Sequence, residues 1–240
     1  MNLEANHAAP DSHTATVASP LPSEALSEDL ALGLLKNRDL CADDVEQIAK
    51  NAAVMKSRKV RLGIAAHPNA PRRIALRLVR ELYTFDLLHF SLSSGAASDL
   101  RRLAEEILMT RITSLALGER ISLARRCTAR VAGVLLLDKE SRVWQTALTN
   151  PRLTETAVTG AIQRPTATAA VVEAICHHSR WCLRPEVRVA LLRNPHTPLA
   201  RAVEFARRIP QSQLKDILQS SRLPEKVRSY LLHDLQLRKK

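Results

Sequence analysis

Residues 187–198 read VRVALLRNPHTP, and two other stretches of the chain repeat this pattern. Residues 60–71 read VRLGIAAHPNAP, and residues 143–154 read VWQTALTNPRLT. When the copies are aligned on Pro68, Pro151 and Pro195, each has a valine eight residues before the proline and a His or Asn directly before it. Three related segments in one chain indicate an internal repeat.

The spacing of the copies gives the length of the repeat. The interval between Pro68 and Pro151 is nearly twice the interval between Pro151 and Pro195. A unit of about 42 residues, with one degenerate copy between the first two, fits both intervals and lies in the range of helical repeats. The similarity also extends upstream, because residues 45–71 align with residues 172–198 without a gap.

The copy at 187–198 predicts a helix that stops at the turn around Pro195. We call such a turn between two helices a corner. Val187, Ala190 and Leu191 have the spacing of one helical face. We expect Asn194 to end this helix, because Asn tolerates left-handed backbone and a residue before proline is pushed out of the helical region.

A second helix is expected to follow the corner. Thr197 is a good helix cap, and Pro198 suits the first helical position, where a missing N–H does no harm. Leu199, Val203 and Ala206 then form the apolar stripe of this helix. Because one helical hairpin cannot cover its own apolar side, we expect about five hairpins stacked on one another.

The composition also favours an all-α protein. Hydrophobic residues make up 45% of the chain and aromatic residues 3%, so the core must be aliphatic. Six glycines are too few for a protein of tight turns or phosphate loops, and the abundant Ala and Leu favour helices. No apolar run approaches the roughly 20 residues that a bilayer requires, and no secretory leader is visible.

The chain is expected to divide into two parts. Residues 1–24 lack periodicity and predict a disordered N-terminal arm, whereas residues 25–240 predict the repeat domain. Leu26, Leu30 and Leu34 have the spacing of its first helix. Further helices are expected at 98–112, 119–137, 210–221 and 223–240, and in the last of these Val227, Leu231 and Leu235 form the apolar stripe.

The pattern VR-x-A-L-x-x-N-P-x-T-P resembles the bacterial leucine-rich repeat variant and HEAT-like families, and the segment from Leu117 resembles a helix pair of HEAT-like proteins. The resemblance implies a right-handed α-solenoid, an armadillo-type fold that generally serves as a scaffold. The cysteine cluster that holds an iron–sulfur centre in leucine-rich repeat variant proteins has no counterpart here, so no cofactor is expected. One HEAT-like branch consists of DNA glycosylases, which use tryptophans and an acid around an extruded nucleotide.

Charge is distributed unevenly along the chain. Residues 1–57 hold 4 basic and 9 acidic side chains, a net charge of −5, whereas residues 58–240 hold 32 basic and 15 acidic ones, a net charge of +17. Such asymmetry is typical of a protein with an anionic partner, although a GC-rich genome also favours Arg and Ala. The candidate binding residues are mostly arginines with helical-face spacing, and Pro185 is expected to leave one of them, Arg184, outside the helix of Arg188. They are Arg73, Arg77, Arg80, Arg126, Arg130, Arg184, Arg188, Arg201 and Arg208. On the concave face of the stack these arginines would form a track for phosphates. On the convex face they would serve only solubility.

Two other groups of residues are candidates for chemistry. Cys176, His177, His178 and Cys182 are soft metal ligands, but their spacing fits no zinc motif, and buried thiols beside exposed histidines are favoured instead. No catalytic motif stands in the chain. Trp144 and Trp181 lack a convincing acidic neighbour, which favours a place in the core over a glycosylase site.

The sequence therefore predicts a non-enzymatic helical-repeat scaffold that holds a protein partner on its concave surface. A nucleic-acid binder that uses the arginine stripes is the first alternative, and a glycosylase-like enzyme is the second. The four cysteines are too sparse for a disulfide framework, so we expect reduced thiols in a cytoplasmic protein without membrane contact. The oligomeric state stays open.

Overall fold

The computed structural model describes residues 26–237, and within them the chain is helical without any strand. This confirms the all-α expectation, while the N-terminal arm predicted at 1–24 lies outside the described residues. The helices are α1 (Glu28–Leu34), α2 (Ala42–Lys50), η1 (Val54–Lys56), α3 (Arg58–Ala66), α4 (Arg72–Glu81), α5 (Thr84–Leu92), α6 (Ser98–Arg111), η2 (Ile112–Ser114), α7 (Leu117–Arg126), α8 (Ala129–Leu135), α9 (Ser141–Leu148), α10 (Glu155–Gln163), α11 (Ala169–His177), α12 (Pro185–Arg193), α13 (Leu199–Arg207), α14 (Gln211–Gln219) and α15 (Glu225–Leu237).

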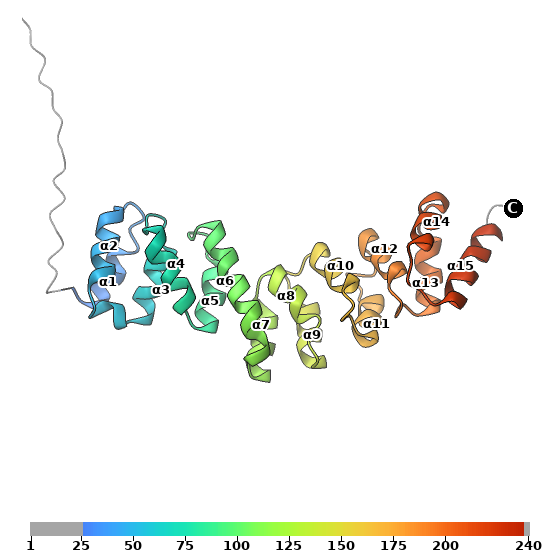
Figure 1. Ribbon diagram of the computed structural model, residues 1–240, viewed down its shortest axis with the longest axis horizontal. Coiled ribbons are helices and arrows are strands. Elements are labelled where there is room, and N and C mark those ends of the chain that lie inside the picture. Colours follow the sequence, from blue (N-terminus) through green and yellow to red (C-terminus); the bar gives the residue numbers. More distant parts are fainter. Residues whose placement is uncertain (1–25, 238–240) are drawn as a thin grey trace, which may run out of the picture.

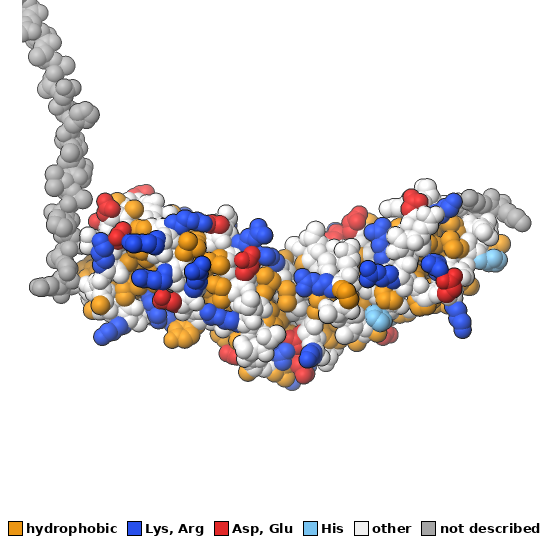
Figure 2. All heavy atoms as spheres, in the orientation of Figure 1, with side chains coloured by type: hydrophobic (Ala, Val, Ile, Leu, Met, Phe, Trp, Pro, Cys, Tyr) orange, Lys and Arg blue, Asp and Glu red, His pale blue; other side chains and the backbone are white. Residues whose placement is uncertain are grey.

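The helices follow one another in chain order along one long axis and form two layers (Figure 1). In the layer of even-numbered helices, α4 packs on α6, α6 on α8, α8 on α10, α10 on α12 and α12 on α14. In the odd-numbered layer α1 packs on α3, α3 on α5, α7 on α9 and α13 on α15. The row is bent, and its hollow side lies along the even-numbered helices at the top of the view (Figures 1 and 2).

The sequence repeat spans three helices, so the expectation that one repeat of about 42 residues is one two-helix hairpin is wrong. Helices α3, α6, α9, α12 and α15 begin at nearly regular intervals along the chain. The third residue of the first four of these helices is Val60, Leu100, Val143 or Val187, and all four are buried. Helix α6 is therefore the degenerate copy, with Leu100 in place of the valine.

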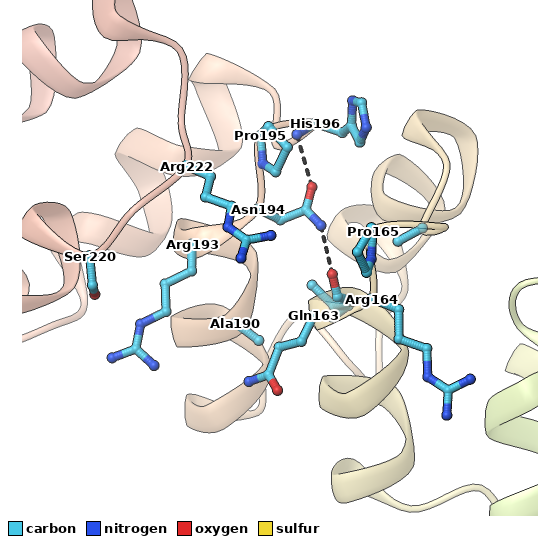
Figure 3. Close-up of a pocket in the computed structure, with 12 residues that line it drawn as sticks. Gln163, Arg164, Pro165, Ala190, Arg193, Asn194, Pro195, His196, Ser220 and Arg222 are labelled. Carbon is cyan, nitrogen blue, oxygen red and sulfur yellow. Dashed lines mark hydrogen bonds between the residues drawn. The ribbon is translucent and has the colours of Figure 1, made fainter.

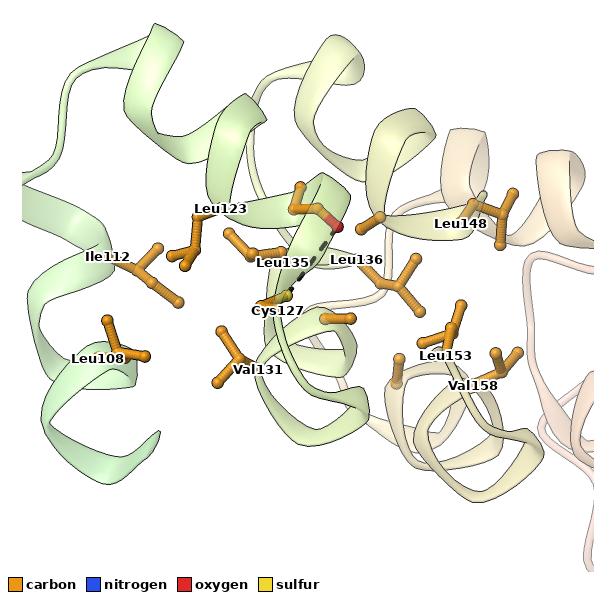
Figure 4. Close-up of a cluster of buried hydrophobic side chains, with 14 of the residues drawn as sticks. Leu108, Ile112, Leu123, Cys127, Val131, Leu135, Leu136, Leu148, Leu153 and Val158 are labelled. Carbon is orange, nitrogen blue, oxygen red and sulfur yellow. Dashed lines mark hydrogen bonds between the residues drawn. The ribbon is translucent and has the colours of Figure 1, made fainter. Parts of the chain in front are cut away.

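An aliphatic core runs between the two layers. In the middle of the row it runs from Leu108 of α6 past the buried Cys127 to Val158 of α10 (Figure 4). Each helix thus covers the apolar side of its neighbours, and the core is aliphatic, as the 3% of aromatic residues implied. Burial of one such aliphatic side chain contributes about 1.5–3 kcal/mol.

The corner after α12 differs in detail from the prediction. Asn194 does end the helix, but with extended backbone (φ −91°, ψ 133°), so the following proline and not left-handed backbone explains the stop. Pro198 is the residue that precedes α13, and the Thr197 hydroxyl donates backward to the carbonyl of Leu191 at 2.6 Å. Thr197 therefore closes α12 and does not begin α13.

In two helices the buried residues differ from those predicted. Leu199 is 45% exposed, and α13 buries Ala202, Phe205 and Ala206 in its place. Leu30 is 50% exposed, and Ala31 is the buried residue of α1.

Residues 119–137 do not form one helix, because the chain turns at Cys127 and Thr128 between α7 and α8. In α15, Leu231 and Leu235 are buried and Val227 is half-buried, so the stripe predicted for the last helix is confirmed.

The buried corner residues link helices of the same layer. Asn150 donates from Nδ2 to the carbonyls of Ala124 (2.8 Å) and Cys127 (3.1 Å) at the end of α7. Its Oδ1 accepts from the backbone N–H of Arg152 at 2.8 Å, which fixes the turn. Asn194 repeats this arrangement, donating to Ile162 of α10 at 2.7 Å and accepting from the N–H of His196 at 2.9 Å.

His67 performs the same task with an imidazole. Its Nδ1 accepts from the backbone N–H of Asn69 at 3.2 Å, so Nε2 carries the hydrogen and donates to the carbonyl of Asn37 at 2.9 Å. The bond reaches back to the segment that follows α1, an earlier helix of the same odd-numbered layer. His67 is therefore held as the neutral Nε2–H tautomer.

At other corners a different side chain supplies the donor. In each case the acceptor is a carbonyl at the end of an earlier helix, which would otherwise lack a partner. These donors are Arg111 Nη1 to Leu82 (2.7 Å), Trp181 Nε1 to Leu148 (3.1 Å) and Ser221 Oγ to Leu192 (2.7 Å).

We expect His67→Ala to lower the free energy of unfolding by about 1–3 kcal/mol, because it leaves a partly buried carbonyl and N–H without a partner. His67→Asn retains an acceptor for the N–H of Asn69 and should cost less, although its amide is shorter than the imidazole. Urea unfolding of the two variants measures the difference. Equal losses would contradict the role assigned to the side-chain acceptor.

Candidate functional site

The arginine stripe predicted on α4 lies on the surface. Arg73, Arg77 and Arg80 are each at least partly exposed, as their spacing suggested. Arg73 pairs with Glu46 of α2 at 3.8 Å. Among the residues that the structure describes, the guanidinium groups of Arg77 and Arg80 have no hydrogen-bond or ion-pair partner. The stripe thus keeps two free cations.

Arg126 and Arg130 do not share a helix, contrary to the prediction. Arg126 is the last residue of α7, and Arg130 lies in α8 beyond the corner at Cys127. Arg130 pairs with Glu105 at 3.5 Å and with Glu106 at 3.3 Å. Its charge is therefore used to join α8 to α6.

Most of the remaining predicted arginines stabilise the fold. Arg188 donates from Nε to the carbonyl of Cys182 at 2.8 Å. Arg201 donates to the carbonyl of Cys176 and stacks on the ring of Phe205. The carbonyl of Cys176 is in the last turn of α11 and lacks an intrahelical partner, whereas that of Cys182 lies in the turn before α12.

Arg201 and Arg208 both pair with Glu204, whose carboxylate lies between them. The predicted shared face of these two arginines therefore exists, but one carboxylate offsets part of its positive charge. Arg184 is exposed and precedes the first residue of α12, as Pro185 suggested.

Another group of unpaired cations surrounds a pocket that the sequence stripes did not include. The pocket has a volume of about 340 Å³ and lies among the corners that follow α10, α12 and α14 (Figure 3). Its basic residues include Arg164, Arg193 and Arg222, one from each corner. Among the residues that the structure describes, no Asp or Glu lines this pocket.

Asn194 fixes the shape of this pocket. Its amide is buried and bonds to both walls, to Ile162 of α10 and to the backbone N–H of His196. Arg222 extends over Asn194, whereas Arg164 and Arg193 extend outward on either side (Figure 3). Asn194 thus ties the two walls together, while the exposed arginine side chains of the rim can change rotamer within nanoseconds.

The three guanidinium groups have no partner among the described residues. They are not needed for the carbonyls of α12, because other donors already bind these. Thr197 Oγ1 binds the carbonyl of Leu191, Ser221 Oγ that of Leu192, and the Arg222 backbone N–H that of Arg193 at 3.1 Å. Elsewhere in the chain arginine side chains perform this task, as Arg111 does for Leu82.

A signal for these residues was present in the sequence. Arg164, Arg193 and Arg222 are equally spaced along the chain. Their spacing is the length of two helices with their connections, the interval that returns the chain to the same layer. The expectation of a longer repeat made of two helices concealed this spacing.

The expectation of buried thiols beside exposed histidines at residues 176–182 holds only in part, because Cys182 and His178 are half-buried. Cys176 is buried, and burial raises the pKa of its thiol to about 12. His178 accepts from the backbone N–H of Arg180 at 3.2 Å, and desolvation with the nearby Arg180 charge lowers the pKa of its imidazole. Within residues 26–237 no group of three or more His, Cys, Asp or Glu side chains is placed to hold a metal ion.

Both tryptophans lie in the core. Trp181 is 1% exposed, and its Nε1 donates to the carbonyl of Leu148 at 3.1 Å, while Trp144 is 8% exposed. Arg180 stacks on the Trp181 ring at 4.2 Å. Neither indole is presented to a base outside the protein.

No protein-family model matches the chain, and no match was found among curated proteins or solved structures. None of the helices within residues 26–237 is both long enough and apolar enough to cross a bilayer.

We expect the four thiols to react in an order set by burial. Cys41 is exposed and should react within the first phase of a labelling experiment with an aromatic disulfide. Cys127 and Cys176 are buried, with the pKa of each thiol raised to about 12 by desolvation, and should react only after unfolding. The Cys41→Ser variant is the control, because it should lose the first phase. Rapid native-state labelling of Cys127 would contradict the packing between α7 and α8.

Proposed function

We propose that this chain is a non-enzymatic scaffold, a right-handed α-solenoid of the HEAT-like type that holds a protein partner along its hollow side. The supporting observation is the arrangement of the helices in two layers along one bent axis (Figure 1). Each helix contacts neighbours that are close in sequence, which is how helical-repeat proteins build long concave surfaces. Such a surface can contact an extended partner over many helices at once.

The charge of the surface indicates the chemistry of the partner. Residues 58–240 carry 32 basic and 15 acidic side chains. Lys and Arg side chains lie along the length of the face in Figure 2, with apolar side chains between them. On α4, in the layer on the hollow side, the unpaired Arg77 and Arg80 are available for ion pairs. We therefore propose an acidic segment of a protein as the partner, steered by long-range attraction.

Nucleic acid is the second candidate, and the same unpaired Arg77 and Arg80 favour it. Guanidinium groups bind phosphate oxygens as readily as carboxylates. The two candidates differ in their response to salt, because each phosphate contact releases condensed counterions and makes affinity fall steeply. The buried positions of Trp144 and Trp181 give no support to a glycosylase.

Reversal of two charges tests the proposed surface. Arg77→Glu with Arg80→Glu should weaken binding of an acidic protein partner by about tenfold or more, equivalent to about 1.4 kcal/mol. The matched control is Arg125→Glu with Arg207→Glu, which changes the net charge equally at exposed positions of α7 and α13 in the other layer. Quantitative affinity purification in moderate salt, with the full-length chain as bait, provides the measurement.

The result separates the two candidates. Partners retained by the wild type and the control, but lost by the α4 variant, would support the scaffold. If duplex DNA or RNA binds at low salt with a steep salt dependence, and the α4 variant reduces this binding, the nucleic-acid candidate replaces it. Equal losses in the α4 variant and the control would contradict a specific role of the hollow side.

A further inference from the structure

We propose that the pocket lined by Arg164, Arg193 and Arg222 is a binding site for a phosphate monoester of a small organic group. The site goes beyond the proposed scaffold, which needs only an extended surface and no pocket. It is also separate from Arg77 and Arg80 in the sequence and in the row of helices, since α4 and α12 lie toward opposite ends (Figure 1).

The first argument is charge without compensation. Three arginines lie around one pocket, and among the described residues its lining contains no Asp or Glu. Arginines on other surfaces of the same chain meet carboxylates, as Arg130 meets Glu105 and Glu106. Holding three like charges at one place has an electrostatic cost, which an anion of charge about −2 would offset.

The second argument is that no structural task remains for these guanidinium groups. The carbonyls at the end of α12 are already bound by Thr197, by Ser221 and by the backbone N–H of Arg222. The same bonds also make the end of α12 less repulsive to a bound anion. Free carbonyls at a helix end repel negative charge, whereas bound ones have their partial charges partly balanced by the donor hydrogens.

The third argument is the form of the pocket. A volume of about 340 Å³ lies at the small end of ligand pockets, which span about 300–1,000 Å³. The walls combine polar Gln163 and Ser220 with the apolar Pro165 and Ala190. A bare phosphate ion would leave the apolar wall in contact with water, so the size and lining favour a phosphate joined to a small organic group.

The geometry defines how the arginines would act. Arg222 extends over Asn194 toward the middle of the site, and Arg164 and Arg193 extend from its sides (Figure 3). Rotation about their side-chain bonds would let Arg164 and Arg193 close on a ligand from opposite sides. Guanidinium groups bind phosphate oxygens through pairs of parallel hydrogen bonds, which discriminates phosphate from smaller anions.

Two sources could supply this ligand chemistry. One is a phosphorylated side chain of a protein partner, in which case the site adds a second contact to the proposed scaffold. The other is a free small phosphoester. A nucleic-acid backbone is a different ligand, because each phosphodiester carries one negative charge and is flanked by sugars on both sides.

Titration calorimetry with the full-length chain tests the site. The probes are a short peptide with phosphoserine, the same peptide with serine, N-acetyl phosphoserine amide, glycerol phosphate and a single-stranded oligonucleotide. The variant Arg193→Gln with Arg222→Gln removes two cations, and Arg125→Gln with Arg207→Gln is the control with the same charge change. Thermal melting of both variants checks that the fold is retained.

We expect saturable binding of the monoester probes to the wild type and the control, with at least tenfold weaker binding to the pocket variant. The serine peptide should not bind. Tighter binding of the phosphopeptide than of the two small phosphoesters would identify a protein source, and equal binding would identify a free phosphoester. Arg77→Glu with Arg80→Glu should leave these affinities unchanged, so the site can fail or succeed independently of the scaffold.

Three results would overturn the proposal. The first is the absence of saturable binding of any monoester to the folded wild type. The second is an equal loss of affinity in the pocket variant and the control, which would show attraction to net charge alone. The third is an oligonucleotide that binds as tightly as the monoesters per phosphate and competes with them, which would assign the pocket to nucleic acid.

Discussion

The free carbonyls at the end of each helix impose the constraint on which this fold depends. A chain of short helices has many such ends, and each buried carbonyl must find a donor. Here the donor comes from a later corner of the chain, as Asn150 shows for the end of α7 and Asn194 for the end of α10. The bond fixes the spacing between helices of one layer, so the corners determine how the row is built.

This constraint explains which parts of the fold could be predicted from the sequence. Helices and their corners follow from apolar spacing and from the prolines, and Val60, Val143 and Val187 are buried as the repeated pattern implied. The number of helices in each unit could not be obtained from that pattern. The same donor task is performed by imidazole, amide, guanidinium, indole and hydroxyl groups, so most corners have no common residue. Only the His-Pro and Asn-Pro corners remained visible as a repeat.

The candidate sites were harder to predict because a stripe of arginines does not reveal its partners. Arg130 and Arg201 were expected on open faces like Arg77, yet both are occupied by contacts with residues distant in sequence. Conversely, Arg164, Arg193 and Arg222 lie on different corners and form no stripe, but the two-layer arrangement brings them to one pocket. The position of an arginine on its own helix determines whether it is exposed. The residues of the neighbouring helix determine whether its charge has a partner.

Urea unfolding of Asn150→Asp at several pH values, beside the wild type, tests the role of the corner amide most directly. The variant keeps the shape of Asn150 but replaces the Nδ2 donor with a carboxylate that faces the carbonyls of Ala124 and Cys127. We predict that it is less stable than the wild type by about 3 kcal/mol or more at neutral pH. Burial beside two carbonyls raises the pKa of a carboxyl, and its protonated form can donate again, so the deficit should shrink as the pH falls. Equal stability of the two proteins at neutral pH would contradict the account.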